Sequence, residues 1–162
     1  MTAQSYLAEH APLVRLTFEL AQKEAEHLRY SFSTLYANDL DEAWVKSLAA
    51  KPALAEKVEA FVSRFSRLQD HIGEKLIPRY AQLVGEQHKT QIDVLNFAER
   101  AGIVPNVDTF LAARKLRNAL VHEYMRDSQS FLEGLLLARG AAQMLFDIVS
   151  KVQAELKRLG VQ

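Results

Sequence analysis

The sequence predicts an all-α fold, an antiparallel helical bundle of about four long helices plus one or two short helices. The 162 residues contain only six glycines and four prolines, so the segments between turns are long. Within these segments apolar residues recur at helical spacing, and no stretch shows the alternation typical of a strand. A chain of this length can bury a real core, and we therefore expect residues 1–162 to form a single helical domain.

The first long helix is expected from about Pro12 to Tyr36, because proline suits the first turn of a helix. Its apolar line consists of Leu13, Leu16, Leu20, Leu28, Phe32 and Leu35. The polar residues that follow, Asn38, Asp39 and Asp41, are typical of a helix end and of the N-cap of a new helix. A short helix through Trp44 and Leu48 is therefore expected next.

A second long helix is expected to begin at Pro52. Its apolar positions are Leu54, Val58, Phe61, Val62, Phe65 and Leu68. Pro78 should bend or interrupt it, because proline removes an internal hydrogen bond and clashes with the preceding turn. After a polar loop, Thr90 can cap a short helix that continues to Ala101.

The last two helices follow a break at the sequence GIVPN. Asn106 or Asp108 is expected to cap the first of them. The final long helix is expected to begin around Ser128, where Ser130 and Glu133 have the spacing of a capping box.

The composition excludes several classes of function. Lys and Arg total 20, as do Asp and Glu, and the formal net charge of zero argues against an overall basic surface for nucleic acid. It leaves a local basic patch open. The absence of cysteine excludes disulfides, thiolate metal sites and a cysteine nucleophile. Neither a signal peptide nor a run of about 18 apolar residues is found, so we expect a cytoplasmic protein without a membrane span.

A metal site is not expected. Glu24 and His27 form a Glu-x-x-His step, which places both side chains on one helix face. Di-iron helical bundles use that step twice, together with further carboxylates. None of the other histidines has a glutamate three residues before it, so an exposed charged face is the better interpretation. We expect neither a metal nor another cofactor.

A charged group lies beside the apolar stripe of the second long helix. Arg67 and His71 are four residues apart and share a face, while Arg67 and Asp70 are three apart and can pair. Arg64 lies one turn earlier. A solvated or salt-bridged face is the simplest interpretation. These residues would have a functional role only if this face meets another basic site.

The stretch KLRNALVHEYMRD, Lys115 to Asp127, places titratable side chains in an otherwise regularly apolar chain. Arg117 and Tyr124 are seven residues apart and lie within about 20° of each other around an ideal helix. Arg117 and His122 lie roughly 140° apart, so one straight helix cannot aim both at one point. They converge only if the helix loosens near His122 or if a second subunit completes the cleft.

The same stretch is locally basic. Between Leu111 and Arg126 the cations are Arg114, Lys115, Arg117 and Arg126, against Glu123 alone. Such a patch suits a polyanion or a nucleotide. Cations also favour the dipole at a helix C-terminus, so the residues alone leave a purely structural role open.

The residues RNALVHEY resemble the Arg-x4-His-x-Tyr motif of the HEPN superfamily, in the branch called HepT. Arg117, His122 and Tyr124 match this motif without a gap, and Asn118 matches the polar residue that usually follows the arginine. The motif covers eight residues. The all-helical plan, the chain length and the position of the motif before one last long helix agree with the family over the whole chain.

The resemblance implies a specific function. Many HEPN proteins are metal-independent endoribonucleases, and HepT members are toxins neutralised by an MNT-type nucleotidyltransferase antitoxin. Members usually form a homodimer in which two copies of the motif face one cleft, which would resolve the separation of Arg117 and His122. The antitoxin transfers AMP to the motif tyrosine, here Tyr124. The alternative is a non-catalytic helical subunit that binds a nucleotide or substrate within a nucleotidyltransferase complex.

The family assigns Arg117 and His122 as the catalytic pair, with Asn118 in a supporting, orienting role. A histidine has an unperturbed pKa of about 6.5 and exchanges protons near neutral pH, whereas a guanidinium can hold two phosphate oxygens. AMP on Tyr124 would add bulk and negative charge where the RNA phosphate should lie. Further RNA phosphate contacts are expected from Arg114, Lys115 and Arg126. The neutral net charge favours a short RNA contact confined to the cleft.

Overall fold

The computed structural model describes residues 5–123 and 126–161. These residues form helices and connecting turns, and no strand occurs among them, which confirms the predicted all-α class. None of the helices in this part of the chain combines the length and apolarity needed to cross a membrane.

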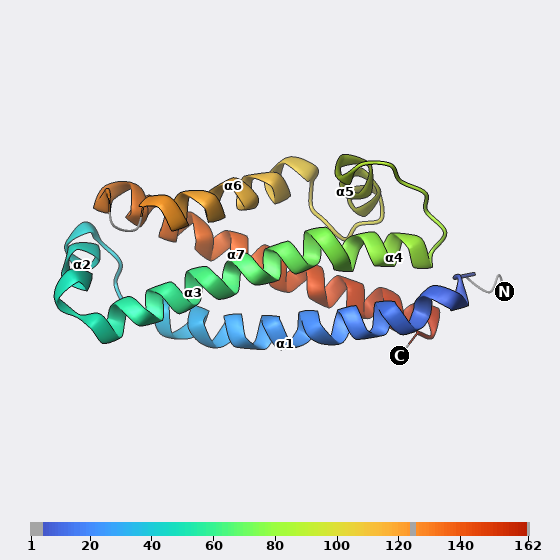
Figure 1. Ribbon diagram of the computed structural model, residues 1–162, viewed down its shortest axis with the longest axis horizontal. Coiled ribbons are helices and arrows are strands. Elements are labelled where there is room, and N and C mark those ends of the chain that lie inside the picture. Colours follow the sequence, from blue (N-terminus) through green and yellow to red (C-terminus); the bar gives the residue numbers. More distant parts are fainter. Residues whose placement is uncertain (1–4, 124–125, 162) are drawn as a thin grey trace.

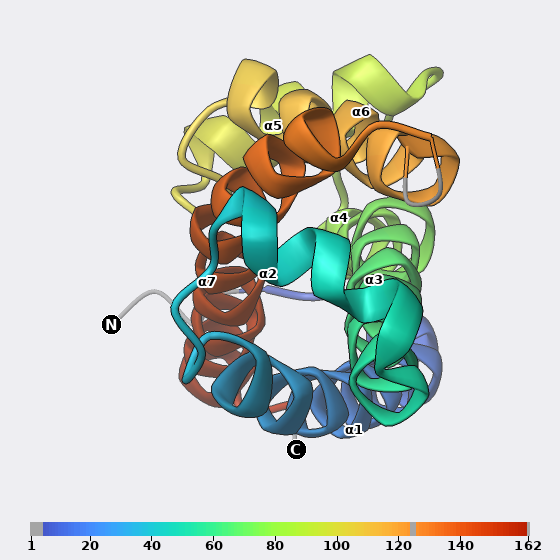
Figure 2. The same ribbon diagram turned by 90° about the vertical axis from the view of Figure 1, so that its left-hand side faces the viewer.

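Three long helices extend along the long axis of the molecule, and a fourth lies over two of them (Figure 1). The three are α1 (Ala11–Leu35), α3 (Pro52–His71) and α7 (Ser128–Leu159). The fourth, α6 (Val107–Glu123), packs on α3 and α7 and lies across the core from α1 (Figure 2). The largest fully buried aromatic side chains of the core are Phe61, Phe65, Phe110 and Phe131.

The buried face of α1 differs from the predicted apolar line. Leu28 and Leu35 are buried as expected, but the leucines at positions 13, 16 and 20 are exposed. Small residues such as Ala21 and Ala25 are buried in their place, which allows a close approach of the neighbouring helices. Periodicity alone could not distinguish the two faces, because each carries apolar residues at helical spacing.

Polar contacts also fix the packing of α1 against α3 and α4. Thr17 of α1 is fully buried, and its hydroxyl accepts a hydrogen bond from Arg79 at 2.7 Å. The carbonyl oxygen of Thr17 accepts from Nε2 of His71 at 2.8 Å. Two side chains from the neighbouring helices therefore bind one residue of α1.

The interruption predicted at Pro78 is confirmed. A π-helical turn, Ile72–Leu76, separates α3 from α4 (Ile77–Leu83), and Pro78 lies in the first turn of α4. Proline has no backbone N–H to donate, and the wider π-helical turn before it suits a helix in which that hydrogen bond is missing. Gly73 in this turn allows α6 to approach closely, since a Cβ there would lie 3.1 Å from Cζ of Phe110.

The predicted caps of the shorter elements are also present. Asp41 caps α2 (Glu42–Ser47) by accepting from the backbone N–H of Trp44 at 2.7 Å. Thr90 caps α5 (Gln91–Arg100) in a capping box with the residue at N3. Of the two candidates for α6, Asn106 is the cap, because its Oδ1 accepts from the backbone N–H three residues later.

The cap of α7 differs from the prediction. The helix begins at Ser128, and the side chain of Asp127 accepts hydrogen bonds from the backbone N–H groups of Gln129 and Ser130. These bonds, led by the one from the Ser130 backbone, lower the pKa of the Asp127 carboxyl. The predicted capping box of Ser130 and Glu133 is wrong, because Ser130 already lies inside the first turn.

Candidate functional site

Three of the motif residues, Arg117, Asn118 and His122, lie on the last two turns of α6, which remains α-helical as far as Glu123. Leu120 faces inward and is buried, whereas Val121 is 59% exposed. The helix does not loosen near His122, so Arg117 and His122 retain the angular separation that helical geometry predicts.

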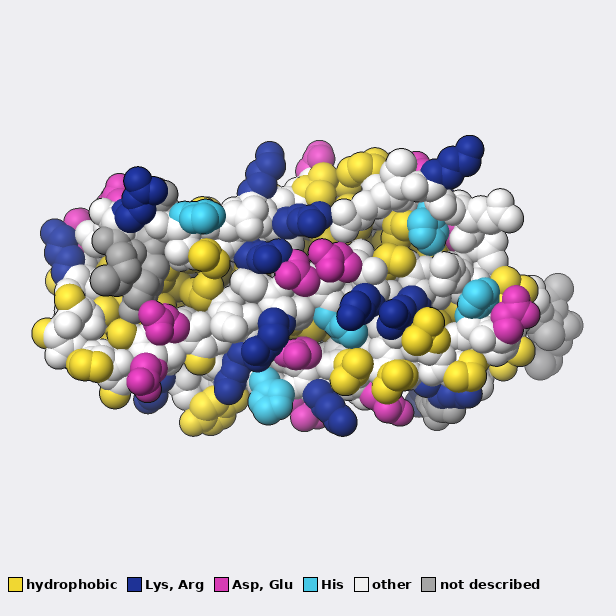
Figure 3. Space-filling view, in the orientation of Figure 1, with side chains coloured by type: hydrophobic (Ala, Val, Ile, Leu, Met, Phe, Trp, Pro, Cys, Tyr) yellow, Lys and Arg dark blue, Asp and Glu magenta, His cyan; other side chains and the backbone are white. Residues whose placement is uncertain are grey.

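A hollow of about 460 Å³ lies between α3 and α6, and we call it the α3–α6 hollow. Its lining residues are Glu59, Val62, Ser63, Ser66, Arg67, Asp70, Arg117, Leu120 and Val121. Buried Val62 and Leu120 give it an apolar base, and charged residues surround that base. Figure 3 shows the face of the molecule seen in Figure 1. Basic side chains gather around the middle of this face, and acidic side chains lie between them.

Arg117 is held in this hollow by Asp70 of α3. Nη1 of the guanidinium donates a hydrogen bond to Oδ1 of the carboxylate, and the two side chains are 27% and 33% exposed. Arg117 makes no other hydrogen bond with the described residues. Its charge is therefore compensated locally, while its remaining N–H groups are available to an anion.

The other predicted phosphate contacts do not converge on Arg117. Arg114 donates to Oε1 of Gln91 at 2.9 Å and lies 3.8 Å from Glu74, so it is directed toward α5. Lys115 is exposed, and no ion pair to it is found in the described part of the chain. The cations of the predicted basic patch therefore lie in different environments and do not form one continuous surface with Arg117.

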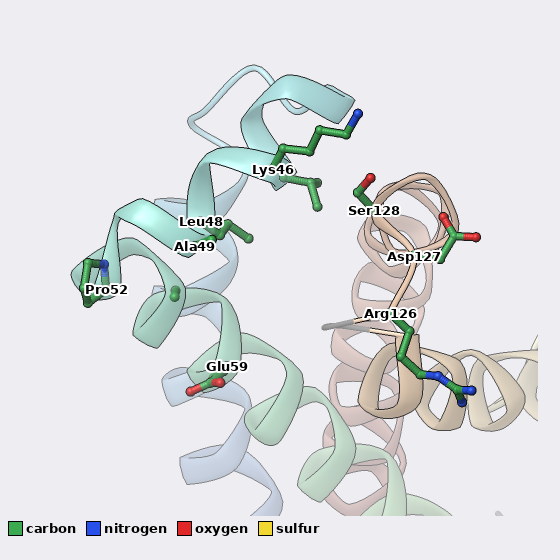
Figure 4. Close-up of a pocket in the computed structure, with 10 residues that line it drawn as sticks. Lys46, Leu48, Ala49, Pro52, Glu59, Arg126, Asp127 and Ser128 are labelled. Carbon is green, nitrogen blue, oxygen red and sulfur yellow. The ribbon is translucent and has the colours of Figure 1, made fainter.

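Arg126 lines a different cavity, of about 520 Å³, between α2, the start of α3 and the start of α7. Its side chain extends away from α2 (Figure 4). Glu59 lines both this cavity and the α3–α6 hollow, so the two adjoin at that residue.

Two further motif residues, Asn118 and His122, are exposed and do not line the hollow. Neither makes a hydrogen bond or ion pair within the described residues. One copy of the chain therefore brings Arg117 together with α3 but not with His122. The predicted AMP acceptor, Tyr124, lies outside the described residues.

Residues of α3 complete the hollow. The pairing of Arg67 with Asp70 that their spacing allows does not form: Nε of Arg67 lies 3.4 Å from Oε2 of Glu24 on α1, and Asp70 binds Arg117. The polar residues Glu59, Ser63, Ser66 and Asp70 were not combined into a site from the sequence. Their spacings of four, three and four residues place them on one helix face, which is the signal that could have identified this wall.

The position of α6 depends on a close contact with α7. A Cβ at Gly134 of α7 would lie 2.9 Å from Cδ2 of Leu120. Glycine at this point lets the base of the hollow sit directly against the α7 backbone.

The Glu24–His27 step also has a structural role. Glu24 pairs with Arg67, and the backbone carbonyl of His27 accepts from Arg64 at 3.0 Å. Within the described residues, no three His, Asp or Glu side chains gather in a way that could hold a metal ion.

Compared with family models, curated proteins and solved structures, the chain matches none of them. The chemistry of the α3–α6 hollow is therefore the basis for a function. Guanidinium N–H groups above an apolar base suit a ligand that combines an anionic group with a flat apolar one, as a nucleotide does.

Proposed function

We propose that this chain is a metal-independent endoribonuclease toxin of the HEPN type, in its HepT branch. The observation that supports this best is the place of Arg117, which lines a hollow with several of its N–H groups unbound. A phosphodiester of single-stranded RNA fits this chemistry, with its phosphate on Arg117 and a base over Leu120 and Val62.

The proposed reaction is an internal transfer at phosphorus. The 2′-oxygen of the ribose attacks the adjacent phosphorus, and the bond to the 5′-oxygen of the next nucleotide breaks. The 2′-hydroxyl loses a proton and the leaving 5′-oxygen gains one, which is the work assigned to His122. Arg117 stabilises the negative charge on the phosphoryl oxygens, and Asn118 orients His122 or the phosphate. The products end in a 2′,3′-cyclic phosphate and a 5′-hydroxyl.

The proposal requires a homodimer. Arg117 and His122 do not converge within one regular helix, so the histidine must come from a second copy of the motif. The exposed Val121, which lines the hollow from α6, supports an interface at this helix.

The remaining parts of the proposal come from the resemblance. They are a single HEPN-type domain built as an antiparallel bundle of four long helices, and an MNT-type nucleotidyltransferase antitoxin in the cytoplasm. The antitoxin would transfer AMP to Tyr124. Arg114, Lys115 and Arg126 would then contact RNA outside the hollow.

A second candidate is a non-catalytic subunit that binds a nucleotide or substrate for a nucleotidyltransferase. It is favoured by the compensation of Arg117 by Asp70 and by the absence of His122 from the lining of the hollow. Both features suit binding without proton transfer.

Incubation of the purified chain with labelled RNA in EDTA separates the two. The nuclease should release 2′,3′-cyclic phosphate ends, and His122→Ala should lower the rate by about 10²–10⁴-fold. His27→Ala is the control, because this histidine is also exposed and its ring makes no hydrogen bond or ion pair with the described residues. RNA binding without cleavage supports the second candidate, and cleavage that depends strictly on added Mg²⁺ contradicts the proposed chemistry.

A further inference from the structure

We propose that Arg67 of α3 is a second RNA phosphate contact of the α3–α6 hollow, acting beside Arg117 of α6. The inference rests on the proposed function, because it takes RNA as the ligand. Its basis is that two guanidinium groups from two different helices line one hollow. Neither the sequence spacing within α3 nor the HEPN motif joins these two residues.

The charges of the lining make a second cation necessary. Arg67 and Arg117 are its cations, and Glu59 and Asp70 are its acids. Because Asp70 already compensates Arg117, a phosphate that binds there needs a further positive charge. Arg67 can supply it, since its acidic partner Glu24 does not line the hollow.

Arg67 is also free to move toward a phosphate. Its ion pair with Glu24 has an N–O distance of 3.4 Å, and the two side chains are 57% and 30% exposed. A solvent-exposed ion pair of this kind contributes little to stability, so an RNA phosphate can replace the carboxylate at low cost.

Its neighbours on the same side of α3 and α4 are held more firmly. Arg64 donates to the carbonyl of His27 and to the hydroxyl of Ser31, and Arg79 donates to the hydroxyl of buried Thr17. Neither lines the hollow. Arg67 is therefore the arginine of this face that combines access to the hollow with a weak partner.

The probe is a fluorescein-labelled, 2′-O-methylated single-stranded oligonucleotide of about 12 nucleotides, which can bind but cannot be cleaved. Fluorescence anisotropy gives Kd over a range of salt concentrations. Loss of one phosphate contact should lower the slope of log Kd against log salt by about 0.7. We expect this change for Arg67→Ala, together with a roughly fivefold weaker Kd near 0.1 M salt.

Arg100→Ala is a matched control. Arg100 of α5 pairs with Glu86 at the same N–O distance, 3.4 Å, with exposures of 65% and 40%, but does not line the hollow. It removes the same charge and the same kind of ion pair, so its slope should equal that of the wild type. Glu24→Gln gives the opposite test: it frees Arg67 and should tighten RNA binding, whereas Glu86→Gln should not.

The outcomes separate this inference from the proposed function. If Arg117→Ala weakens RNA binding while Arg67→Ala behaves like Arg100→Ala, the inference is overturned and the nuclease proposal stands. If the probe binds with the expected Arg67 dependence but unmodified RNA is not cleaved, the inference stands and the nuclease proposal falls. A wild-type chain that does not bind the probe contradicts both. Thermal unfolding of Arg67→Ala, which changes an exposed side chain, should match the wild type.

Discussion

Arg117 of α6 donates a hydrogen bond to the carboxylate of Asp70 on α3, and this ion pair joins the two walls of the α3–α6 hollow. The pair connects α6, which carries the motif, to α3, and Asp70 lies 47 positions before Arg117 in the chain. The carboxylate engages one nitrogen of the guanidinium and so fixes its direction. Asp70 is therefore a positioning residue for the proposed phosphate contact.

Asp70→Ala should reduce kcat for RNA cleavage by about tenfold without weakening RNA binding, because Arg117 keeps its charge but loses its fixed direction. A double-mutant cycle with Arg117→Ala, measured on the free energy of unfolding, should give a coupling of about 1 kcal/mol. The Lys46–Glu42 pair at 3.2 Å is a control, because both of its side chains are more exposed. Its coupling should be smaller, about 0.3–0.5 kcal/mol. Equal couplings for the two pairs would show that Asp70 does not hold Arg117 in solution.

A mixing experiment tests whether His122 acts on the hollow of another copy. Arg117→Ala and His122→Ala should each be inactive alone. If the site takes its arginine from one copy and its histidine from the other, a heterodimer of the two variants retains one intact site. Random exchange of subunits should then restore about a quarter of the wild-type activity.

The control is a mixture of Arg117→Ala with the double variant Arg117→Ala/His122→Ala, which contains no intact arginine and should remain inactive. Failure of the first mixture to regain activity, with subunit exchange verified by mass spectrometry, would mean that the catalytic pair is not shared between copies.

The glycines of α7 provide a test of how α6 is held. Gly140→Ala should raise the free energy of unfolding by about 0.5–1 kcal/mol, because a Cβ there meets no atom within 4 Å and alanine favours a helix. Gly134→Ala should instead destabilise by roughly 1 kcal/mol or more, because its Cβ would press on Leu120, which is buried and has little room to move.

The difference between the two variants measures the contact of α6 with α7, since the helix and the substitution are the same. Leu120→Ala should cost less in the Gly134→Ala background than in the wild type. Equal stability of the two glycine variants would contradict the close contact.

The sequence predicts the helices better than it predicts their contacts. The interruption before Pro78 and the cap at Thr90 follow from local chemistry, namely a missing N–H and a side-chain acceptor, and both are present. The exposed leucines of α1 and the cap at Asp127 were missed. Which leucines of α1 are buried depends on which of its faces meets α3. The cap of α7 depends on the residue at which that helix begins.

The candidate site shows the same division. Helical geometry separates Arg117 from His122, and the structure keeps them apart within one copy. The partner of Arg117 was not predictable, because spacing within α3 only allowed a pair of Asp70 with Arg67, whereas packing brings Asp70 to α6. A pairing rule for one helix cannot account for a neighbour supplied by tertiary structure.

The last prediction concerns Tyr124, the AMP acceptor that the resemblance implies. Tyr124→Phe removes one hydroxyl, so toxicity should be retained at least in part if the hydroxyl is not needed for cleavage. The variant cannot accept AMP and should escape neutralisation. Growth is measured on co-expression with the MNT-type partner, alongside intact-mass analysis for added AMP. Tyr30→Phe is the control, because Tyr30 of α1 is 69% exposed and lies outside the motif; it should still be modified and neutralised. If Tyr124→Phe is also neutralised and gains AMP, the acceptor is another residue, and blocking of the hollow through this tyrosine is wrong.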